Sequence, residues 1–336
     1  GVGSEDDIEA AANRILTSVS GRFELGGHEV YSTCSVGIAV FPRDGTDVES
    51  LIKNADTAMY RAKENGRNRC QFFHEEMNVR VARRLALESQ LRLALERGEL
   101  QLHYQPKFDL ASGKLAGAEA LIRWNNAELG SVSPAQFIPV AEDTDLIVPI
   151  GRWILQEACA QARRWLDTFG ITLCIAVNIS ARQFHSVELL STVRGALDNN
   201  GLNPQQLQLE ITESMVMHDP LTAIGLLTEL KALGLSIALD DFGTGYSSLA
   251  YLKKFPIDVL KIDQSFVAGL ALDKDDVAIV RTITELARNL GLTTVAEGVE
   301  DHSQERVLRD IQVDEVQGYR FGRPVPAAEF EGWLRT

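Results

Sequence analysis

Two adjacent carboxylates, Asp240 and Asp241, occupy a position in the sequence that suggests chemistry. They follow a short apolar run, residues 237–239, which is long enough for a buried strand. Gly243 and Gly245 come next and allow the chain to turn sharply. Two neighbouring acids repel each other, and burying them is unfavourable unless a cation lies beside them. The stretch is therefore either a solvated turn or part of a metal site.

Further polar residues follow other strand-like runs of the chain. Each has an ordinary alternative, because an acid after a strand is often a first-turn residue of the next helix, and a lone lysine is often solvated or ion-paired. Taken together, these residues would bring a polar group from each of several consecutive strands to the same rim of the fold. They are Glu119, Arg123, Asn178, Glu210, Glu213, Lys261, Asp263, Glu297, Glu300 and Gln317.

Carboxylates with one amide, and no Cys/His cluster, are the donors that Mg²⁺ or Mn²⁺ prefers. The acids suffice for two ions, which would activate a water molecule for attack on phosphorus. Arg123 would hold a phosphate oxygen, and Lys261 would orient the water or stabilise developing charge. The pattern predicts a phosphodiester substrate.

Strand-like and helix-like runs alternate after residue 100, which predicts an α/β fold, a (β/α)₈ barrel of the TIM type. An open doubly wound sheet is the runner-up, but no Gly-x-Gly-x-x-Gly follows the first strand. In a barrel, the polar groups above would meet at the carboxyl ends of the strands. The expected strands are residues 100–104, 115–124, 173–179, 207–212, 236–239, 259–262, 293–296 and 315–321. The expected helices include residues 149–169, 186–199, 221–233, 276–290 and 303–309.

These motifs resemble, in order, those of the EAL family of cyclic-di-GMP phosphodiesterases. The resemblance covers nearly all of residues 87–334, and it implies a barrel with one strand reversed. It also implies hydrolysis of one phosphodiester of cyclic di-GMP to linear pGpG with two ions, Mg²⁺ or Mn²⁺. The motifs are Glu119-Ala120-Leu121 with Arg123, Asp240-Asp241-Phe242-Gly243-Thr244-Gly245, Lys261-Ile262-Asp263, Glu297-Gly298-Val299-Glu300 and Gln317-Gly318-Tyr319.

The resemblance also implies a role for each residue. One metal would be held by Glu119, Asn178, Glu210 and Asp240, and the second by Asp240 and Asp241 with Glu297 or Asp263. Lys261 would act on the water, and Gln317 would either orient the water or support a neighbouring ligand. Gln105 and Arg123 would contact the substrate. Glu213 would anchor the loop 242–248, and Glu300 the loop after the seventh strand.

A catalytically silent cyclic-di-GMP receptor is the alternative, although such a module would typically have lost a metal ligand and none is missing here. The family also suggests a homodimer through the loop and helix that follow Asp241. Leu249, Tyr251 and Leu252 of that helix have an intramolecular core as their alternative.

Residues 1–75 resemble the C-terminal half of a GGDEF (diguanylate cyclase) domain, through Ser35-Val36-Gly37-Ile38-Ala39, residues 56–63 and Asn65-Gly66-Arg67-Asn68. The family's signature loop would lie upstream, so no cyclase activity is expected here. A charged amphipathic pattern predicts a helix over residues 76–98, with residues 76–86 as a linker and 87–336 as the phosphodiesterase domain.

The composition sets limits on partners. A formal net charge of −14 over 336 residues disfavours a nucleic acid polymer. Four dispersed cysteines suit a reducing, cytoplasmic compartment. No apolar run is long enough for a membrane segment, although the parent protein would be tethered if upstream residues supplied an anchor.

Two positions depart from the family pattern. Asp145 stands where the family usually has glycine, which bears on a loop conformation. Arg320 stands where an aliphatic residue is more common, and either adds a cation near the site or points outward.

Overall fold

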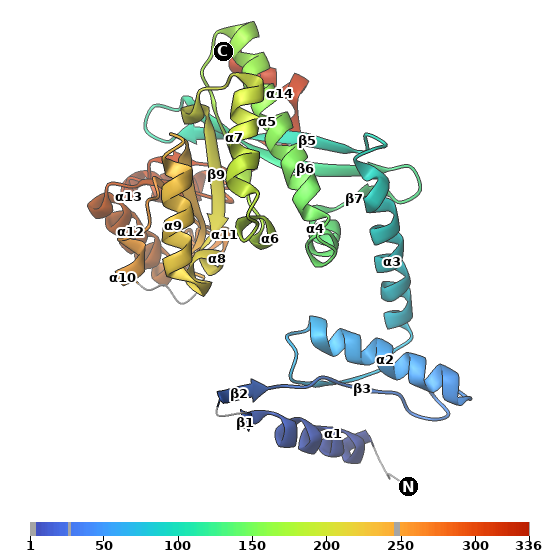
Figure 1. Cartoon of the computed structure of the whole chain (residues 1–336). Helices are drawn as coiled ribbons and strands as arrows, with labels where there is room; N and C mark the ends of the chain where they lie inside the picture. Colours follow the sequence, from blue (N-terminus) through green and yellow to red (C-terminus); the bar gives the residue numbers. More distant parts are fainter. Residues whose placement is uncertain (1–4, 26–27, 245–248, 336) are drawn as a thin grey trace. The chain divides into compact units, whose positions relative to one another are not determined.

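The computed structural model describes residues 5–25, 28–244 and 249–335. The chain divides into two compact units, Gly1–Ser89 and Gln90–Thr336 (Figure 1). Family-based predictions about the segment 245–248, including much of the expected mobile loop, lie outside the described residues.

The first unit contains a hairpin, a small parallel sheet and three helices. β1 and β2 pair antiparallel, whereas β3 and β4 pair parallel. β2 and β3 therefore belong to different sheets, and the polar stretch 33–35 separates them. The elements are α1 (Glu5–Val19), β1 (Gly21–Leu25), β2 (His28–Ser32), β3 (Val36–Ile38), α2 (Val48–Glu64), β4 (Cys70–Phe72) and α3 (Glu76–Ala94), which runs on into the second unit.

The core of the first unit is small. Ala58 of α2 packs with Phe73 and Met77. Asp47 caps the start of α2, since its side chain accepts a hydrogen bond from the backbone N–H of Ser50 at 2.8 Å.

The second unit is a closed barrel, as predicted. Eight strands follow one another around it, and the β5–β6 pairing closes the ring. β5 runs antiparallel to both of its neighbours, β6 and β13, whereas the other neighbouring pairs are parallel. The open doubly wound sheet is thereby excluded. The strands are β5 (Leu100–Asp109), β6 (Leu115–Asn126), β8 (Cys174–Asn178), β9 (Leu207–Thr212), β10 (Ser236–Phe242), β11 (Val259–Ile262), β12 (Thr293–Ala296) and β13 (Glu315–Val316).

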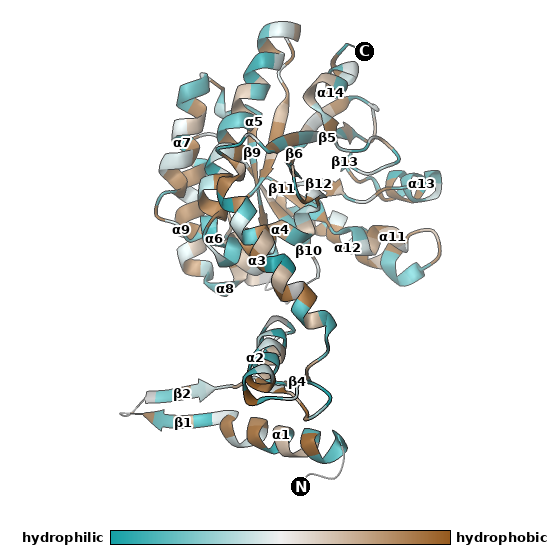
Figure 2. Cartoon of the chain, turned by 90° about the vertical axis from the view of Figure 1, so that its right-hand side faces the viewer, coloured by the Kyte–Doolittle hydropathy of each residue, from teal (hydrophilic) through white to brown (hydrophobic). Residues whose placement is uncertain are grey.

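The central strands are buried over most of their length, so both of their faces carry core residues. Figure 2 shows apolar residues gathered on these strands and polar ones on the outer helices. Two short strands flank the ring: β7 (Gly130–Val132) pairs with β6, and β14 (Val325–Pro326) pairs with β5.

Helices follow the strands and cover the barrel. Gly170, Gly201 and Gly291 end three of them in the left-handed conformation that glycine adopts without strain. The helices are α4 (Pro134–Asp143), α5 (Ile147–Phe169), α6 (Ala181–Phe184), α7 (Leu189–Asn200), α8 (Glu213–His218), α9 (Pro220–Lys231), α10 (Leu249–Leu252), α11 (Gln264–Ala268), α12 (Lys274–Leu290), α13 (His302–Ile311) and α14 (Ala327–Leu334), with a 3₁₀ turn at Pro204–Gln206. None of the described helices is both long and apolar enough to cross a membrane.

The last barrel strand is shorter than predicted. β13 ends at Val316, and the chain then turns back on itself, with the N–H groups of Phe321 and Gly322 donating to the Gly318 carbonyl at 3.0 Å. A Cβ on Gly318 would lie 2.1 Å from the Val299 carbonyl oxygen. This close backbone approach fixes the turn against the loop after β12.

Asp145 adopts a backbone conformation that glycine accepts without strain. Its φ is 58°, in the left-handed region, and its carboxylate lies 3.7 Å from the Arg182 guanidinium. This conformation places strain on a residue with a Cβ.

We predict that Asp145→Gly raises the free energy of unfolding by about 1 kcal/mol, because it relieves that strain while losing only an exposed ion pair. Arg194→Gly, at an exposed position within helix α7, should lower it by about the same amount. Urea denaturation of both variants checks this. A destabilised Asp145→Gly variant would contradict it.

Candidate active site

The barrel brings most of the predicted polar residues together around one buried ammonium group. Lys261 of β11 is 1% exposed. Its Nζ lies 2.7 Å from Glu210 Oε2, 2.9 Å from Asp240 Oδ2 and 2.7 Å from Glu297 Oε1. These three carboxylates come from β9, β10 and the end of β12, so four neighbouring strands meet at this group. Burial of the charges is tolerated because they are paired.

Glu119 of β6 lies in the same cluster and is held at both oxygens. Its Oε1 accepts a hydrogen bond from Asn178 Nδ2 at 2.6 Å, and its Oε2 accepts one from Gln317 Nε2 at 2.5 Å. Asn178 at the end of β8 and Gln317 just after β13 thus fix the direction of this carboxylate.

The two adjacent aspartates lie at an irregular point of β10. The pairing with β11 shifts between Leu239 and Phe242, and Asp241 has a φ of 54°. The Asp241 N–H donates to Asp240 Oδ1 at 2.8 Å, and the Asp241 carbonyl accepts from the Thr244 hydroxyl at 2.8 Å. Strain of this kind is common at functional sites, and here it turns both carboxylates toward one side.

Asp240, Asp241 and Glu297 form an acidic cluster that can hold a metal ion. One carboxylate oxygen from each lies within 4.8 Å of the others. The donors are all hard oxygens, as a divalent cation such as Mg²⁺ requires. Two buried oxygens nearby, Glu210 Oε1 and Gln317 Oε1, have no hydrogen-bond partner, so they are available to a ligand. The residues present therefore fit a metal.

Burial and mutual repulsion shift the ionisation of the cluster. Burial, with the nearby carboxylates, raises the pKa of Glu210 to about 7 and that of Glu297 to about 8. Burial also raises the pKa of Asp241, as does Asp240 beside it. Burial opposes ionisation of Glu119, yet Lys261 and the amides of Gln317 and Asn178 hold its pKa below the usual value.

Lys261 itself stays protonated. Burial alone would lower its pKa, but Glu210 and Glu297 outweigh that effect and raise it well above the usual value. The side chain therefore donates hydrogen bonds to the carboxylates around it.

A cavity of about 450 Å³ opens onto this cluster. Tyr319, half exposed, and Glu300 also line it. Its deeper walls are formed by Gln105, Glu119, Asp240, Lys261, Glu297 and Gln317.

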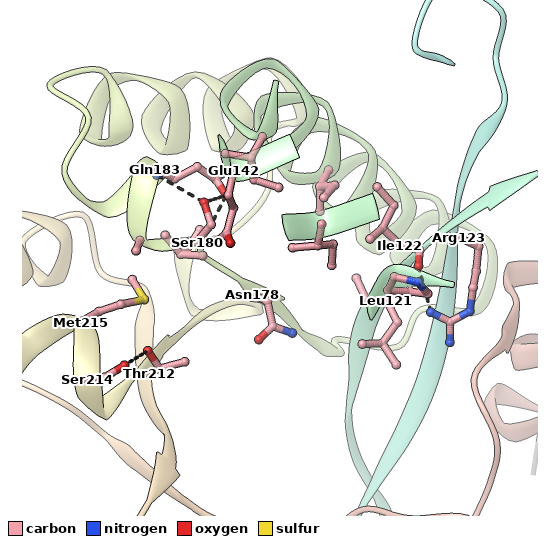
Figure 3. Close-up of a pocket in the computed structure, with 17 residues that line it drawn as sticks. Leu121, Ile122, Arg123, Glu142, Asn178, Ser180, Gln183, Thr212, Ser214 and Met215 are labelled. Atoms are coloured by element: carbon pink, nitrogen blue, oxygen red, sulfur yellow. Dashed lines mark hydrogen bonds between the residues drawn. The ribbon is translucent and has the colours of Figure 1, made fainter. Parts of the chain in front are cut away.

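A second cavity, of about 380 Å³, adjoins the first, since Leu121 lines both. Figure 3 shows Arg123 and Leu121 on one side of it and Glu142 near Ser180 and Gln183 on another. Its walls are mostly apolar, with Ile138 and Met215 among them. Burial raises the pKa of Glu142, and so does the neighbouring Asp143. Burial lowers the pKa of Arg123, whose guanidinium donates to the Ile122 carbonyl at 2.8 Å.

Three predicted residues lie at the edge of the cluster. Glu213 Oε2 accepts a hydrogen bond from the Gly243 N–H at 3.1 Å, at the start of the loop it was expected to anchor. Asp263 caps α11 through the Ser265 N–H at 3.0 Å. The backbone N–H of Glu300 donates to Gln304 Oε1 of α13 at 2.7 Å.

Sequence reasoning missed Lys107, a second buried lysine inside the barrel. Its Nζ lies 2.7 Å from Gln208 Oε1 and 3.7 Å from Glu210 Oε1. Its position two residues after Gln105, on the same face of a strand, could have indicated that Lys107 also points into the barrel. Arg320, by contrast, is half-buried and pairs with α13: its Nη2 lies 3.4 Å from Glu305 Oε2.

Comparison with known proteins identifies the family of the chain. A protein-family model described as "EAL domain" matches residues 88–324. The chain belongs to the EAL-domain family. A second model, "Diguanylate cyclase, GGDEF domain", matches residues 2–69. Both resemblances expected from the sequence are confirmed.

The relatives include proteins that are named as cyclic di-GMP phosphodiesterases. "Bifunctional diguanylate cyclase/cyclic di-GMP phosphodiesterase MucR" of Pseudomonas aeruginosa is 46% identical over 96% of this chain and 47% of its own length. "Cyclic di-GMP phosphodiesterase PdeR" of Escherichia coli is 42% identical over 99% of this chain and 50% of its own length. The chain thus spans about half the length of these relatives.

A solved structure, "PaMucR Phosphodiesterase, c-di-GMP complex", matches this EAL domain closely. It superposes with a TM-score of 0.71 and 48% sequence identity, covering 73% of this chain and 99% of that one.

The raised carboxyl pKa values predict how a metal acts on stability. Glu210 and Glu297 have folded-state pKa values above the usual 4.5, so their protonated forms contribute to the free energy of unfolding. This contribution is complete below about pH 4.5 and is lost as the pH rises through about 7 and 8. A divalent cation binds the ionised carboxylates and offsets that loss. We therefore predict that Mn²⁺ raises Tm more at about pH 8 than at about pH 5.5. Thermal denaturation with Mn²⁺ or EDTA checks this, and an equal or larger rise at the lower pH would contradict it.

Proposed function

We propose that the chain is a metal-dependent cyclic-di-GMP phosphodiesterase that opens one phosphodiester to give linear pGpG. The observation that carries the proposal is the cluster of buried carboxylates around Lys261, on the wall of a cavity next to Arg123. Cyclic-di-GMP phosphodiesterases among the relatives, and the complex of one with cyclic di-GMP, support it.

Glu119, Asn178, Glu210 and Asp240 would hold one Mg²⁺ or Mn²⁺ ion. Asp240 and Asp241, with Glu297 or Asp263, would hold a second. Bound there, such ions make water a stronger nucleophile and stabilise negative charge on phosphate oxygens. The unpartnered Glu210 Oε1 and the close approach of Asp240, Asp241 and Glu297 support these assignments.

The chain's own groups supply the remaining chemistry. In the reaction, the water oxygen forms a bond to phosphorus, the bond from phosphorus to the 3′ oxygen breaks, and that oxygen takes a proton. Lys261, which stays protonated, would orient the water and stabilise developing charge. Glu297 Oε1, 2.7 Å from the Lys261 ammonium, would accept the proton that the water releases.

The second cavity suits a guanine base. Its walls are mainly apolar, as stacking of a purine requires, and it contains a carboxylate, Glu142. A carboxylate accepts hydrogen bonds from the two adjacent N–H groups that only guanine carries among the purines of nucleic acids. Arg123, in the same cavity, would hold the phosphate attached to that nucleoside.

We also propose the domain organisation, the assembly, the substrate class and the cellular location of the chain. Residues 87–336 are the phosphodiesterase domain, preceded by a linker helix at 76–86 and a GGDEF-like fragment at 1–75. The chain forms a homodimer through the segment after Asp241. It acts on a small dinucleotide rather than a polymer. The location is cytoplasmic, which the four free thiols support.

A silent receptor for cyclic di-GMP is the competing function. Product analysis separates the two: incubation with cyclic di-GMP and Mg²⁺ or Mn²⁺ should give linear pGpG. Tight binding without product in either metal would contradict the enzyme and favour the receptor.

We predict that Glu119→Ala lowers turnover at least about 100-fold, because a metal ligand is lost. Glu188→Gln, which alters an exposed carboxylate paired with Arg152, should leave turnover unchanged. Steady-state assays with the linear product as the readout check both. Undiminished turnover in Glu119→Ala would remove this residue from the metal site.

We also predict that Glu142→Gln raises KM about tenfold with little change in kcat, because the loss of an acceptor weakens base recognition alone. Asp143→Asn, at the exposed neighbouring position, is the matched control and should keep the KM of the parent chain. A fall in kcat at constant KM would argue against a base site in this cavity.

A further inference from the structure

Three buried side chains, two amides and one carboxylate, are connected by hydrogen bonds in a row that ends at a backbone carbonyl. Gln105 Nε2 donates to the Gly322 carbonyl at 3.0 Å. Gln317 Nε2 donates to Gln105 Oε1 at 2.9 Å and to Glu119 Oε2 at 2.5 Å. Gln105, Gln317 and Glu119 are 7%, 4% and 6% exposed. We call this line, Gly322–Gln105–Gln317–Glu119, the amide relay.

The direction of every amide in the relay is forced by its two ends. A backbone carbonyl and an ionised carboxylate only accept hydrogen bonds, so the amide beside each must present its NH₂ group. Gln105 therefore turns Nε2 to Gly322 and Oε1 to Gln317. Gln317 must then use both of its N–H groups, one on Gln105 and one on Glu119. Neither amide can flip without placing two acceptors face to face.

The consequence is that Gln317 Oε1 has no partner within the protein. It is buried, and Gln317 lines the cavity at the carboxylate cluster. A buried polar atom without a hydrogen bond is destabilising, and a donor that reaches it relieves that cost. The donors that enter this cavity in the proposed reaction are water and the substrate's hydroxyl groups.

The anchor of the relay is itself rigid. Gly322 N–H donates to the Gly318 carbonyl at 3.0 Å, and a Cβ on Gly322 would lie 2.6 Å from Pro106. Gln105 stands directly opposite Glu119 in the β5–β6 register. Because β5 is the reversed strand between β6 and β13, it carries Gln105 into the space between Glu119 and Gln317.

We propose that Gln105 is a positioning residue that acts through Gln317, directing Gln317 Oε1 into the cavity as the acceptor that orients the attacking water. The inference rests on the proposed phosphodiesterase function and replaces the substrate-contact role expected for Gln105 from the sequence. A contact with substrate would make Gln105 a determinant of KM, whereas the relay makes it a determinant of kcat.

A double-mutant cycle in the full chain tests this, with cyclic di-GMP as substrate and Mn²⁺ present. Gln105→Met keeps the length of the side chain and removes both its donor and its acceptor. We expect it to lower kcat about tenfold with KM within about twofold of the parent. Gln317→Met should lower kcat at least as much. The double variant should be no slower than Gln317→Met alone, because Gln105 then has nothing left to position.

A matched control is Gln161→Met, which removes another buried glutamine, one that contacts Arg164 of α5 and lies outside the site. It should leave kcat and KM unchanged even if Tm falls. If Gln105→Met does not fold, Gln105→Glu removes the same Nε2 donor and carries the same expectation.

Two results would overturn the inference. The first is a raised KM with unchanged kcat in Gln105→Met. The second is a double variant whose losses multiply, which would mean that the two glutamines act independently. A parent chain that forms no linear product contradicts the phosphodiesterase function itself, so the two failures are distinguishable.

Discussion

The pairing of the Lys261 ammonium with three buried carboxylates is the constraint on which the rest of the site depends. Removing Lys261 would leave uncompensated buried carboxylates, at a cost of about 3–5 kcal/mol. The charges are held by strands, whose backbones are fixed by pairing on both sides, rather than by loops. A closed barrel supplies this geometry because each strand must keep its register with two neighbours.

The reversed strand β5 explains features that an all-parallel barrel would lack. It places Gln105 opposite Glu119 and carries Lys107 deeper, to within 3.7 Å of Glu210. The carboxylates are thus approached by Lys261 from one strand and by Lys107 from another. The same strand connects Glu119 to the turn after β13 through hydrogen-bonded amides. Fixed polar groups of this kind are what a site that stabilises developing charge requires.

The barrel and most of the cluster could be predicted from the sequence, because Glu210, Asp240, Lys261 and Glu297 each lie on or directly after an apolar run. Parallel strands bring such positions to one edge by topology alone. Glu142 could not be found this way, since it lies on helix α4 and reaches the site only through tertiary packing. The early end of β13 could not be predicted from the sequence, because it depends on the approach of Gly318 to Val299, a contact between distant turns.

Hydrolysis of cyclic di-GMP in ¹⁸O-labelled water with Mn²⁺ tests whether this cluster directs water onto phosphorus. We expect linear pGpG with a single ¹⁸O atom in its new terminal phosphate, because the bond from phosphorus to the 3′ oxygen is the one that breaks. Linear product without label in that phosphate, or no linear product from a chain that binds the dinucleotide, would contradict it.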